Sequence, residues 1–276
     1  MRYYIAIPDI HGMRAQLDKA LADIDIWIEH KKADGTIKPE DKIQFIFLGD
    51  YIDRGPDSKY VLAKVKEYVL RRGAICLLGN HDLFLTGTAE GTGVYFESSG
   101  KTFYNSDIWQ ENGGLKTCKE MYGSKFDQHF RESTKVSDYV ESIKNSEEYE
   151  FLKTHAKRKH ETELIFFSHA PQSDPKQYDD TILVWGRSRD YDKPDSIFKV
   201  PGLKAMSVHG HYHKAFDGIF FPRIINYVHG GRAKTVVLAD SGCGCNAYGE
   251  LHPVIIAESP IEENGASDYV TVLAIL

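Results

Sequence analysis

The sequence predicts an α/β fold built from parallel βαβ units. Three short apolar runs, at residues 3–7, 43–48 and 74–78, each end in a polar cluster. Two longer segments between them repeat apolar residues at spacings of three and four, as a helix with one buried face does. Strand, polar loop and helix therefore alternate, which is typical of a parallel sheet covered by helices. In such sheets ligands gather at the carboxyl ends of the strands.

The two helices are predicted from the positions of their apolar residues. In the first, from residue 13 to about residue 30, these are Leu17, Ala20, Leu21, Ile24 and Ile28. In the second, over residues 56–72, they are Val61, Leu62, Val65 and Val69. Both patterns place one apolar stripe toward the expected sheet.

The stretch from residue 83 to residue 160 differs from its surroundings. It is polar, rich in Glu, Lys and Ser, and includes the segment GTAEGTGVYFESSG. We interpret it as a mostly helical cap inserted between strands. The second half of the chain is rich in short apolar runs with turn signals between them. Further strands are expected at residues 163–167, 181–185, 204–208, 235–239, 254–257 and 269–275.

No internal repeat, low-complexity tract or clear linker divides the sequence, so residues 1–276 are expected to form a single domain. The formal net charge of −6 argues against bulk binding to nucleic acid or to an anionic membrane, although a local basic patch could still bind one phosphate group. The four cysteines form no CxxC pair, and a disulfide framework is not expected in a chain of this size. The first residues lack a signal-like apolar run, and no 18-residue apolar stretch occurs, which predicts a cytoplasmic protein without membrane spans.

Candidate ligands follow five of the predicted strands. In chain order they are Asp9 with His11, Asp50 with Asp53, Asn80 with His81, His169, and His211 with His213. Each group alone has an ordinary explanation, such as a helix cap or a polar turn. Five in succession, each directly after an apolar strand, are better explained by a metal site. Carboxylate, amide and imidazole ligands without thiolate suit Mn, Fe or Zn.

Two such ions held about 3.5–4 Å apart can stabilise both the attacking and the leaving oxygen of a phosphoryl displacement. A carboxylate between two strand ends is the natural bridge between them, and Asp50 is the central one.

The local sequences PDIHG, GDYIDRG, GNHD, SHAP and GHYH occur in this order, and together they resemble the calcineurin-like metallophosphoesterase superfamily. GDYIDRG followed by GNHD resembles its phosphoprotein-phosphatase branch. That branch includes phage lambda phosphatase-like enzymes, bacterial serine/threonine phosphatases and symmetrical diadenosine tetraphosphate hydrolases. The resemblance extends from residue 9 to residue 213. It implies a four-layer α/β/β/α sandwich carrying the cap, residues 83–160, as an insertion.

The resemblance also implies two divalent metal ions, with Mn²⁺ expected first and Fe or Zn as alternatives. Asp9 and His11 would hold the first ion, Asn80, His169 and His211 the second, and Asp50 would bridge them. His213 stays open: in the wider superfamily a GHxH motif supplies one ligand to each metal, so His213 either joins the first ion or lines the pocket. His209 precedes the motif and is expected to be structural or to support a ligand.

Catalytic roles follow from the same resemblance. A metal-bridging hydroxide would attack phosphorus in line. His81 would act as general acid, with Asp53 orienting it and raising its pKa. Arg54 would bind phosphate oxygens. A second phosphate-binding arginine is expected in VWGRSRD, with Arg187 preferred and Arg189 as the alternative.

Three functions remain open from the sequence. The first expectation is a serine/threonine protein phosphatase acting on a phosphoprotein or a small phosphorylated substrate, and the alternative is a symmetrical dinucleoside tetraphosphate or other nucleotide hydrolase. A non-catalytic scaffold is a remote third, because the chain keeps every motif residue. Asp82 stands where protein phosphatases usually have Glu, and Asp there is more typical of the dinucleotide hydrolases.

The cap should discriminate between the first two functions, because aromatic side chains there could stack on a nucleotide base. The candidates are Tyr95, Phe96, Phe103, Tyr104 and Trp109, although we expect these to form the cap's own core. The segment ENGG at residues 111–114 resembles a segment near the cap of the phage-type enzymes. Cys243 and Cys245 are expected to be ordinary loop thiols.

Overall fold

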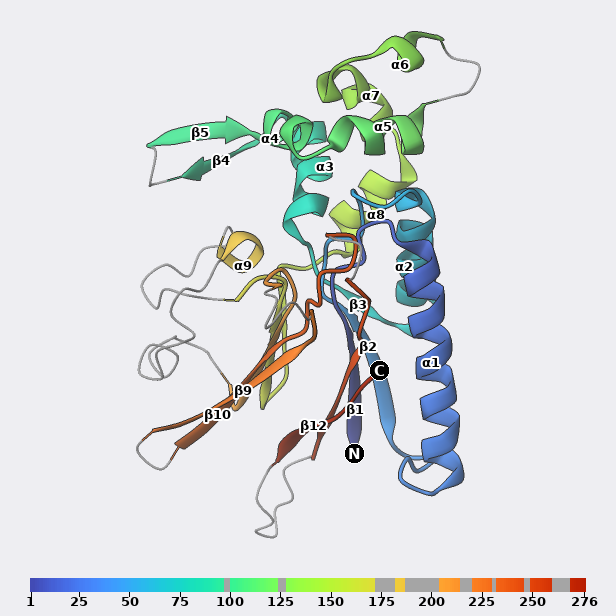
Figure 1. Ribbon diagram of the computed structural model, residues 1–276, viewed down its shortest axis with the longest axis vertical. Coiled ribbons are helices and arrows are strands. Elements are labelled where there is room, and N and C mark those ends of the chain that lie inside the picture. Colours follow the sequence, from blue (N-terminus) through green and yellow to red (C-terminus); the bar gives the residue numbers. More distant parts are fainter. Residues whose placement is uncertain are drawn as a thin grey trace.

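Two five-stranded mixed sheets packed against each other form the centre of the molecule (Figure 1). The computed structural model describes residues 1–96, 100–123, 128–171, 182–186, 204–213, 220–229, 232–245, 249–259 and 269–276. The first sheet has the order β12 (Val270–Ile275), β11 (Val254–Glu258), β1 (Arg2–Ile7), β2 (Lys42–Phe47) and β3 (Ile75–Cys76). The second has the order β6 (Lys159–Glu161), β7 (Ile165–Ser168), β8 (Met206–His209), β10 (Arg232–Leu238) and β9 (Arg223–His229).

Parallel pairing brings the strand ends that carry the candidate ligands to one edge. β1 runs parallel to β2, and β2 parallel to β3. In the second sheet β7, β8 and β10 are also parallel neighbours. The remaining pairs, β1 with β11, β11 with β12, β6 with β7 and β9 with β10, are antiparallel. The carboxyl ends thus lie together within each sheet, and the contact of His169 Nε2, after β7, with Asp50 Oδ1, after β2, at 3.5 Å shows that the two sets meet at the same end of the molecule.

The two faces of strand β1 contribute to two different parts of the hydrophobic core. Alternate residues of a strand face opposite sides of the sheet. Tyr4 and Ala6 lie in the core between the two sheets, whereas Ile5 and Ile7 lie in the core on the helical side. Both faces are covered, so β1 is an almost continuous apolar run instead of an alternating one.

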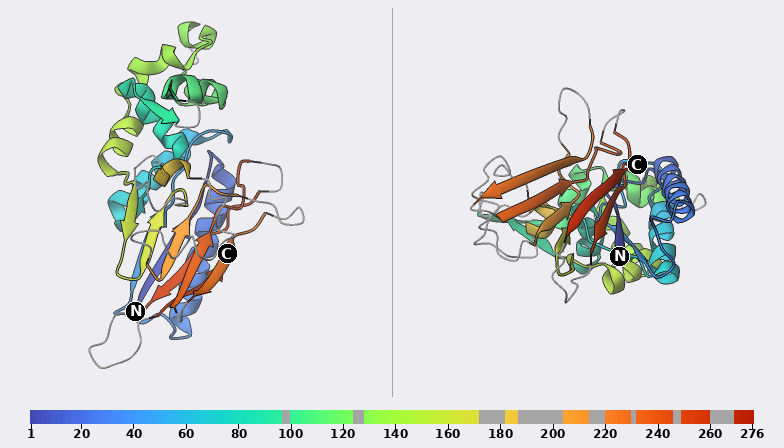
Figure 2. Two further views of the ribbon diagram at one scale, coloured as in Figure 1. Left: turned by 90° about the vertical axis from the view of Figure 1, so that its left-hand side faces the viewer. Right: turned by 90° about the horizontal axis from the view of Figure 1, so that it is seen from below.

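Helices α1 (Arg14–Ala33) and α2 (Ser58–Arg72) cover the outer face of the first sheet, as the views in Figures 1 and 2 show. Their buried residues include the whole predicted stripe of α1 and, on α2, Val61, Leu62 and Val65, whereas the predicted Val69 is only partly buried. Helix α2 ends at Gly73, which has a left-handed backbone with φ of 63°. The prediction of two amphipathic helices is confirmed.

The cap lies beyond one end of the sheets (Figures 1 and 2). It begins with α3 (Asn80–Glu90) and a hairpin of β4 (Gly93–Phe96) and β5 (Lys101–Tyr104). It continues through α4 (Asn105–Glu111), α5 (Gly114–Tyr122), α6 (Gln128–Glu132), the 3-10 helix η1 (Val136–Tyr139), α7 (Val140–Lys144) and α8 (Glu147–His155). Helix α3 packs against α4, α7 and α8. This stretch is mostly helical, as predicted, with one hairpin.

One predicted strand is wrong. Residues 181–185 were expected in a strand, but α9 (Ile182–Trp185) is a short helix. A brief apolar run cannot be assigned to strand or helix by periodicity alone. Trp185 packs its ring against Phe84 of the cap, with ring centroids 5.4 Å apart, and Val184 is buried. Packing against α3, rather than pairing in a sheet, accounts for this segment.

Three of the four expected layers are formed by described residues: α1 with α2, the first sheet and the second sheet. After α8, the part of the chain that the structure describes contains only one helix, α9, so the expected outer helical layer is not seen there. The strands β6 and β9 and the hairpin β4–β5 were not anticipated. Among the described residues, no helix has both the length and the apolar character needed to cross a membrane.

Candidate active site

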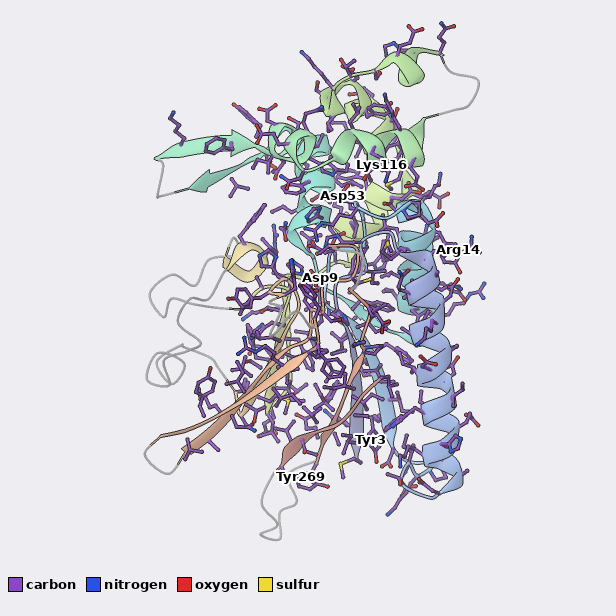
Figure 3. All side chains as sticks on the ribbon, in the orientation of Figure 1. Tyr3, Asp9, Arg14, Asp53, Lys116 and Tyr269 are labelled. Atoms are coloured by element: carbon purple, nitrogen blue, oxygen red, sulfur yellow. The ribbon has the colours of Figure 1, made fainter. Side chains whose placement is uncertain are left out.

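Polar residues from both sheets meet at the end of the molecule that faces the cap. Asp9, Asp50 and Asn80 follow β1, β2 and β3, whereas His169 and His211 follow β7 and β8. The first four are at most 4% exposed, and His211 is partly buried. Figure 3 labels Asp9 at this end of the sheets. The structure thus brings together the side chains that the sequence placed after five separate strands.

Asp50 is the centre of the cluster. Its Oδ2 lies 3.6 Å from His11 Nε2, and its Oδ1 lies 3.5 Å from His169 Nε2. Two groups of metal-compatible side chains occur in the described part of the chain, and Asp50 belongs to both. One is His11, Asp50 and His81, the other is Asp50, His169 and His211, and the ligand atoms of each lie within 4.8 Å of one another. A carboxylate shared in this way suits a bridge between two cations.

Backbone carbonyls orient two of the histidines. His11 Nδ1 lies 3.0 Å from the carbonyl oxygen of Ile52, and His169 Nδ1 lies 2.8 Å from that of Leu48. With Nδ1–H donating to a carbonyl, Nε2 faces the centre of the cluster with its lone pair. Burial lowers the pKa of both imidazoles well below its usual value, which keeps them neutral. Neutral imidazole is the form that binds a metal.

Asp9 and Asn80 complete the cluster in different ways. Asn80 Oδ1 lies 3.1 Å from His169 Nε2, beside the second group. Asp9 Oδ1 accepts a hydrogen bond of 2.9 Å from the backbone N–H of His211 and lies 3.9 Å from His169 Nδ1. Asp9 therefore borders the second group, although its expected role is with the first ion.

The charge balance of this pocket fits divalent metal ions. Asp9, Asp50, Asp82 and Asp240 are all at most 3% exposed. Burial raises the pKa of Asp9 well above its usual value, and the charges of Asp240 and Asp50 raise it further. Burial likewise raises the pKa of Asp50. Several buried carboxylates so close together require a compensating cation or protons, and the imidazole and amide ligands beside them suit Mn, Fe or Zn.

The backbone around the cluster is unusual. Five non-glycine residues among those described have positive φ: His11, Asp50, Asp53, Arg54 and His211, with angles of 51–72°. All five are candidate site residues. Such conformations are costly for residues with a Cβ and concentrate at functional sites.

Glycines in the motifs permit close approach of side chains. A Cβ at Gly79 would collide with the carboxylate of Asp50, and one at Gly210 would collide with that of Asp9. The glycines of GNHD and GHYH are therefore needed for space next to the ligands that follow them.

Asp82 joins two of the strand-end loops. Its carboxylate accepts hydrogen bonds from the backbone N–H groups of Asp50, at 2.7 Å, Tyr51, at 3.0 Å, and Gly79, at 2.9 Å. Burial, and then the nearby charge of Asp50, raises the pKa of Asp82 to about 7. Asp82 thus fixes the loop after β2 to the start of α3, which positions Asp50 relative to Asn80.

His81 lies at the border between the cluster and the cap. Its Nδ1 is 2.7 Å from Asp53 Oδ2, and its backbone N–H donates to Asp50 Oδ1 at 2.8 Å. Burial acts to lower the pKa of His81, but the charge of Asp50 and the hydrogen bond to Asp53 outweigh it, so the pKa is raised. Arg54 is exposed, and its Nη2 lies 3.4 Å from His81 Nε2. An imidazole with a raised pKa and a guanidinium, both beside metal-compatible side chains, can bind and protonate a phosphate ester.

His213 is not part of either metal-compatible group in the described residues. Its Nδ1 lies 3.0 Å from Asp240 Oδ2 and 3.7 Å from the thiol of Cys245, to which Arg54 also donates. Sequence reasoning missed Asp240, although it follows the predicted strand 235–239 just as Asp9 and Asp50 follow theirs. His209 is fully buried, with Nδ1 2.9 Å from Ser168 Oγ.

The remaining candidates, for phosphate binding and for base stacking, lie partly in the cap and partly outside the described residues. Arg187 and Arg189 lie outside the described residues, as do the side chains of Tyr95 and Phe96. Trp109 is fully buried, so it cannot stack on a substrate base, whereas Phe103 is 42% and Tyr104 57% exposed.

A family model described as calcineurin-like phosphoesterase matches residues 4–215. The chain belongs to this family. The match covers both clusters around Asp50 and the loop of His211, so the assembled strand ends are those of a calcineurin-like phosphoesterase.

Curated relatives of this phosphoesterase match over shorter stretches. A symmetrical bis(5'-nucleosyl)-tetraphosphatase from Nitrosospira multiformis is 52% identical over 52 residues, 19% of this chain and 18% of the relative. One from Janthinobacterium is 36% identical over 86 residues, covering 31% and 26%. An asymmetrical bis(5'-nucleosyl)-tetraphosphatase from Oceanobacillus iheyensis is 35% identical over 75 residues, covering 27% and 28%. The matches thus span less than a third of each relative's length.

Solved structures similar to this chain include a putative diadenosine tetraphosphatase, with a TM-score of 0.46 and 17% identity over 98% of this chain and 93% of that one. A protein serine/threonine phosphatase from Saccharomyces cerevisiae has a TM-score of 0.47 and 15% identity over 98% and 78%.

Proposed function

We propose that this chain is a metal-dependent phosphoesterase that hydrolyses dinucleoside polyphosphates, with symmetrical cleavage of a bis(5'-nucleosyl) tetraphosphate as its reaction. One observation carries the choice of substrate: the three curated relatives are all bis(5'-nucleosyl)-tetraphosphatases, and two of them are symmetrical. Asp82 in GNHD also favours this branch. The sequence alone placed a serine/threonine phosphatase first, and the comparisons favour its alternative.

The metal ions would be held by the cluster around Asp50. Asp9, His11, Asp50, Asn80, His169 and His211 supply the oxygen and nitrogen ligands, and Mn²⁺ is the first choice for both ions. Bound divalent cations would polarise phosphoryl oxygens and lower the pKa of water, so that water could supply the attacking nucleophile near neutral pH. His213 would support the first ion through Nε2, because its Nδ1 faces Asp240.

Residues that face the cap would donate the proton and bind the phosphate. His81 would donate its Nε2 proton to the oxygen that leaves phosphorus as the P–O bond breaks. Asp53, bonded to Nδ1, would keep the ring oriented and cationic until then. Arg54 would hold phosphate oxygens beside His81, since its guanidinium is exposed and 3.4 Å from that ring.

The hairpin β4–β5 would offer the base-binding surface. Phe103 and Tyr104 on β5 are the exposed aromatic residues of the described cap. Stacking of a base on an aromatic ring is worth about 1–3 kcal/mol and tolerates any base. Such a surface would serve a dinucleotide and would have little use for a phosphoserine peptide.

The experiment compares substrates on the Mn²⁺-loaded protein. P1,P4-di(adenosine) tetraphosphate and a phosphoserine peptide are supplied separately, and products are separated by ion-exchange chromatography. Symmetrical cleavage yields two ADP molecules per substrate, and asymmetrical cleavage yields ATP and AMP. A dinucleotide rate at least about a hundredfold higher, with ADP as product, is expected, and that ratio corresponds to roughly 3 kcal/mol of discrimination. The reverse order of rates would favour the protein phosphatase and reject the proposal.

A further inference from the structure

The carboxylate of Asp53 is held by the cap as well as by His81. Asp53 is fully buried. The indole N–H of Trp109 donates to both of its oxygens, at 2.9 Å to Oδ1 and 2.8 Å to Oδ2. The hydroxyl of Thr117 donates to Oδ1. His81 Nδ1 approaches Oδ2 at 2.7 Å. Figure 3 shows Asp53 closer to the cap helices than Asp9 is.

Both donors come from far along the chain. Trp109 lies on α4 and Thr117 on α5, which are 56 and 64 residues from Asp53 in sequence. Neither side chain is available to solvent, at 0% and 4% exposure. The backbone of Asp53, by contrast, is held locally: its N–H donates to Ser58 Oγ at 3.2 Å, and its carbonyl accepts from the N–H of Gly55 at 2.7 Å. The orientation of this carboxylate therefore depends on where α4 and α5 lie.

The ENGG segment, residues 111–114, explains how the indole reaches Asp53. Gly113 has φ of 88°, a left-handed conformation that glycine adopts without strain and that lets the chain turn from α4 into α5. Gly114 lies directly against the indole, and a Cβ there would collide with the ring of Trp109. The two glycines thus bring α5 close to Trp109 and allow Thr117, one turn further along, to reach the same carboxylate.

We propose that Trp109 and Thr117, set by the Gly113–Gly114 turn, are positioning residues for proton donation by His81. The inference rests on the proposed role of His81 as general acid. Donors on both carboxylate oxygens leave Asp53 one direction in which to accept from His81 Nδ1, and this directs Nε2 toward the leaving oxygen. Displacement of the cap helices would release that constraint while the ligands around Asp50 stay in place.

The test uses the full Mn²⁺-loaded chain and two aryl phosphates. p-Nitrophenyl phosphate has a good leaving group and needs little protonation, whereas phenyl phosphate has a poor one. General acid catalysis is worth about 10²–10⁴-fold, and loss of one positioning hydrogen bond is expected to remove about tenfold. Thr117→Val should lower kcat on phenyl phosphate by that amount and change kcat on p-nitrophenyl phosphate at most twofold. KM and the Mn²⁺ content should not change.

Thr117→Ser, which restores the hydroxyl, should restore the rate on phenyl phosphate. Thr86→Val is the matched control, because the Thr86 hydroxyl contacts only carbonyl groups of its own helix, at 3.4 Å. If Thr117→Val does not fold, Trp109→Phe and Gly114→Ala test the same contact from the other helix and should give the same selective loss.

Two results would overturn the inference. Equal losses on both phosphates, or loss of Mn²⁺, would indicate a purely structural contact. Unchanged rates in folded variants would indicate that the contact does not matter. Failure of the proposed function has a different signature: Mn²⁺-loaded wild-type protein that hydrolyses the aryl phosphates but not the dinucleotide rejects the proposed substrate, while the ratio of its two aryl phosphate rates still tests the role of Thr117. A leaving-group dependence seen in His81→Ala but absent from Thr117→Val rejects only this inference.

Discussion

The two halves of the site are held in place by different kinds of contact. On the metal side, His11 and His169 are oriented by backbone carbonyls of the loop after β2, at Ile52 and Leu48. On the acid side, Asp53 is oriented by side chains from two cap helices, Trp109 and Thr117. The first half depends on local geometry at the sheet edge, whereas the second depends on how the cap packs. Metal binding and proton donation should therefore be separable by mutation.

The largest expected effect comes from a substitution of Asp50, which belongs to both metal-compatible groups. Asp50→Asn keeps the shape of the side chain but removes the charge common to both groups. Loss of metal assistance costs several kcal/mol of transition-state stabilisation, so we expect activity to fall by about 10³-fold or more. Elemental analysis should show less bound Mn²⁺. Asp25→Asn, an exchange at an exposed position on α1, is the control and should retain both.

The next largest effect is expected from a substitution that removes only the proposed general acid, His81. His81→Ala should keep its metal and lose about 10²–10⁴-fold in turnover, most on substrates with poor leaving groups. His81 also falls within one metal-compatible group, together with His11 and Asp50. Elemental analysis decides between these roles: a variant stripped of Mn²⁺ would make His81 a ligand and end its assignment as general acid.

Removal of the metal should reveal how the buried carboxylates make the stability of the folded protein depend on pH. The pKa values of Asp9, Asp50 and Asp82 are raised in the metal-free fold, chiefly by burial. Their protonation stabilises the folded state below pH ~4, the usual range of the unfolded chain, and this contribution is lost as pH rises through the folded pKa, about 7 for Asp82.

These carboxylates should therefore lower the melting temperature of chelated protein as pH rises from 5 to 8, whereas the buried imidazoles of His11 and His169, whose pKa values are lowered, act in the opposite direction below pH ~6.5. Added Mn²⁺ should raise the melting temperature more at pH 8, because it neutralises the same carboxylates. A site at 1,000 times its Kd contributes about 4 kcal/mol. Calorimetry on the chelated and loaded forms measures both slopes, and a pH-independent effect of metal would contradict the carboxylate assignment.

The smallest effect concerns the link between the loops. Asp82→Asn replaces a carboxylate that accepts from three backbone N–H groups with an amide that presents one oxygen. We expect a loss of about 2–3 kcal/mol in the free energy of unfolding, because buried donors lose their acceptor. Denaturant titration measures it. Asp82→Glu, the residue usual in protein phosphatases, keeps the charge and should be less damaging, and equal losses would argue that volume matters more than hydrogen bonding.

The sequence predicted which side chains gather around Asp50, and the pairing of His81 with Asp53, better than it predicted the contacts of Asp53 with the cap. Asp9 and Asp50 follow neighbouring parallel strands, so pairing predicts that they lie side by side, and His169 follows an apolar strand of the second sheet in the same way. Asp240 obeys the same rule and could have been found by it. Trp109 and Thr117 could not, since their approach to Asp53 results from the packing of α4 and α5, which no local pattern encodes. The strand predicted at residues 181–185 was wrong for a related reason: whether a four-residue apolar run forms a strand or a helix depends on what it packs against.

Strand β1 has a consequence for biosynthesis. Its antiparallel neighbour β11 pairs Arg2 with Glu258, so one side of β1 has no partner until residues 254–258 have been made. At roughly 5–20 residues per second, that interval lasts on the order of 10–50 s. During this time the apolar segment Tyr4–Ile7 presents an open edge on the ribosome, where it could pair with another chain. Nascent chains stalled before residue 254 should thus bind chaperones, whereas chains that include β11 should release them.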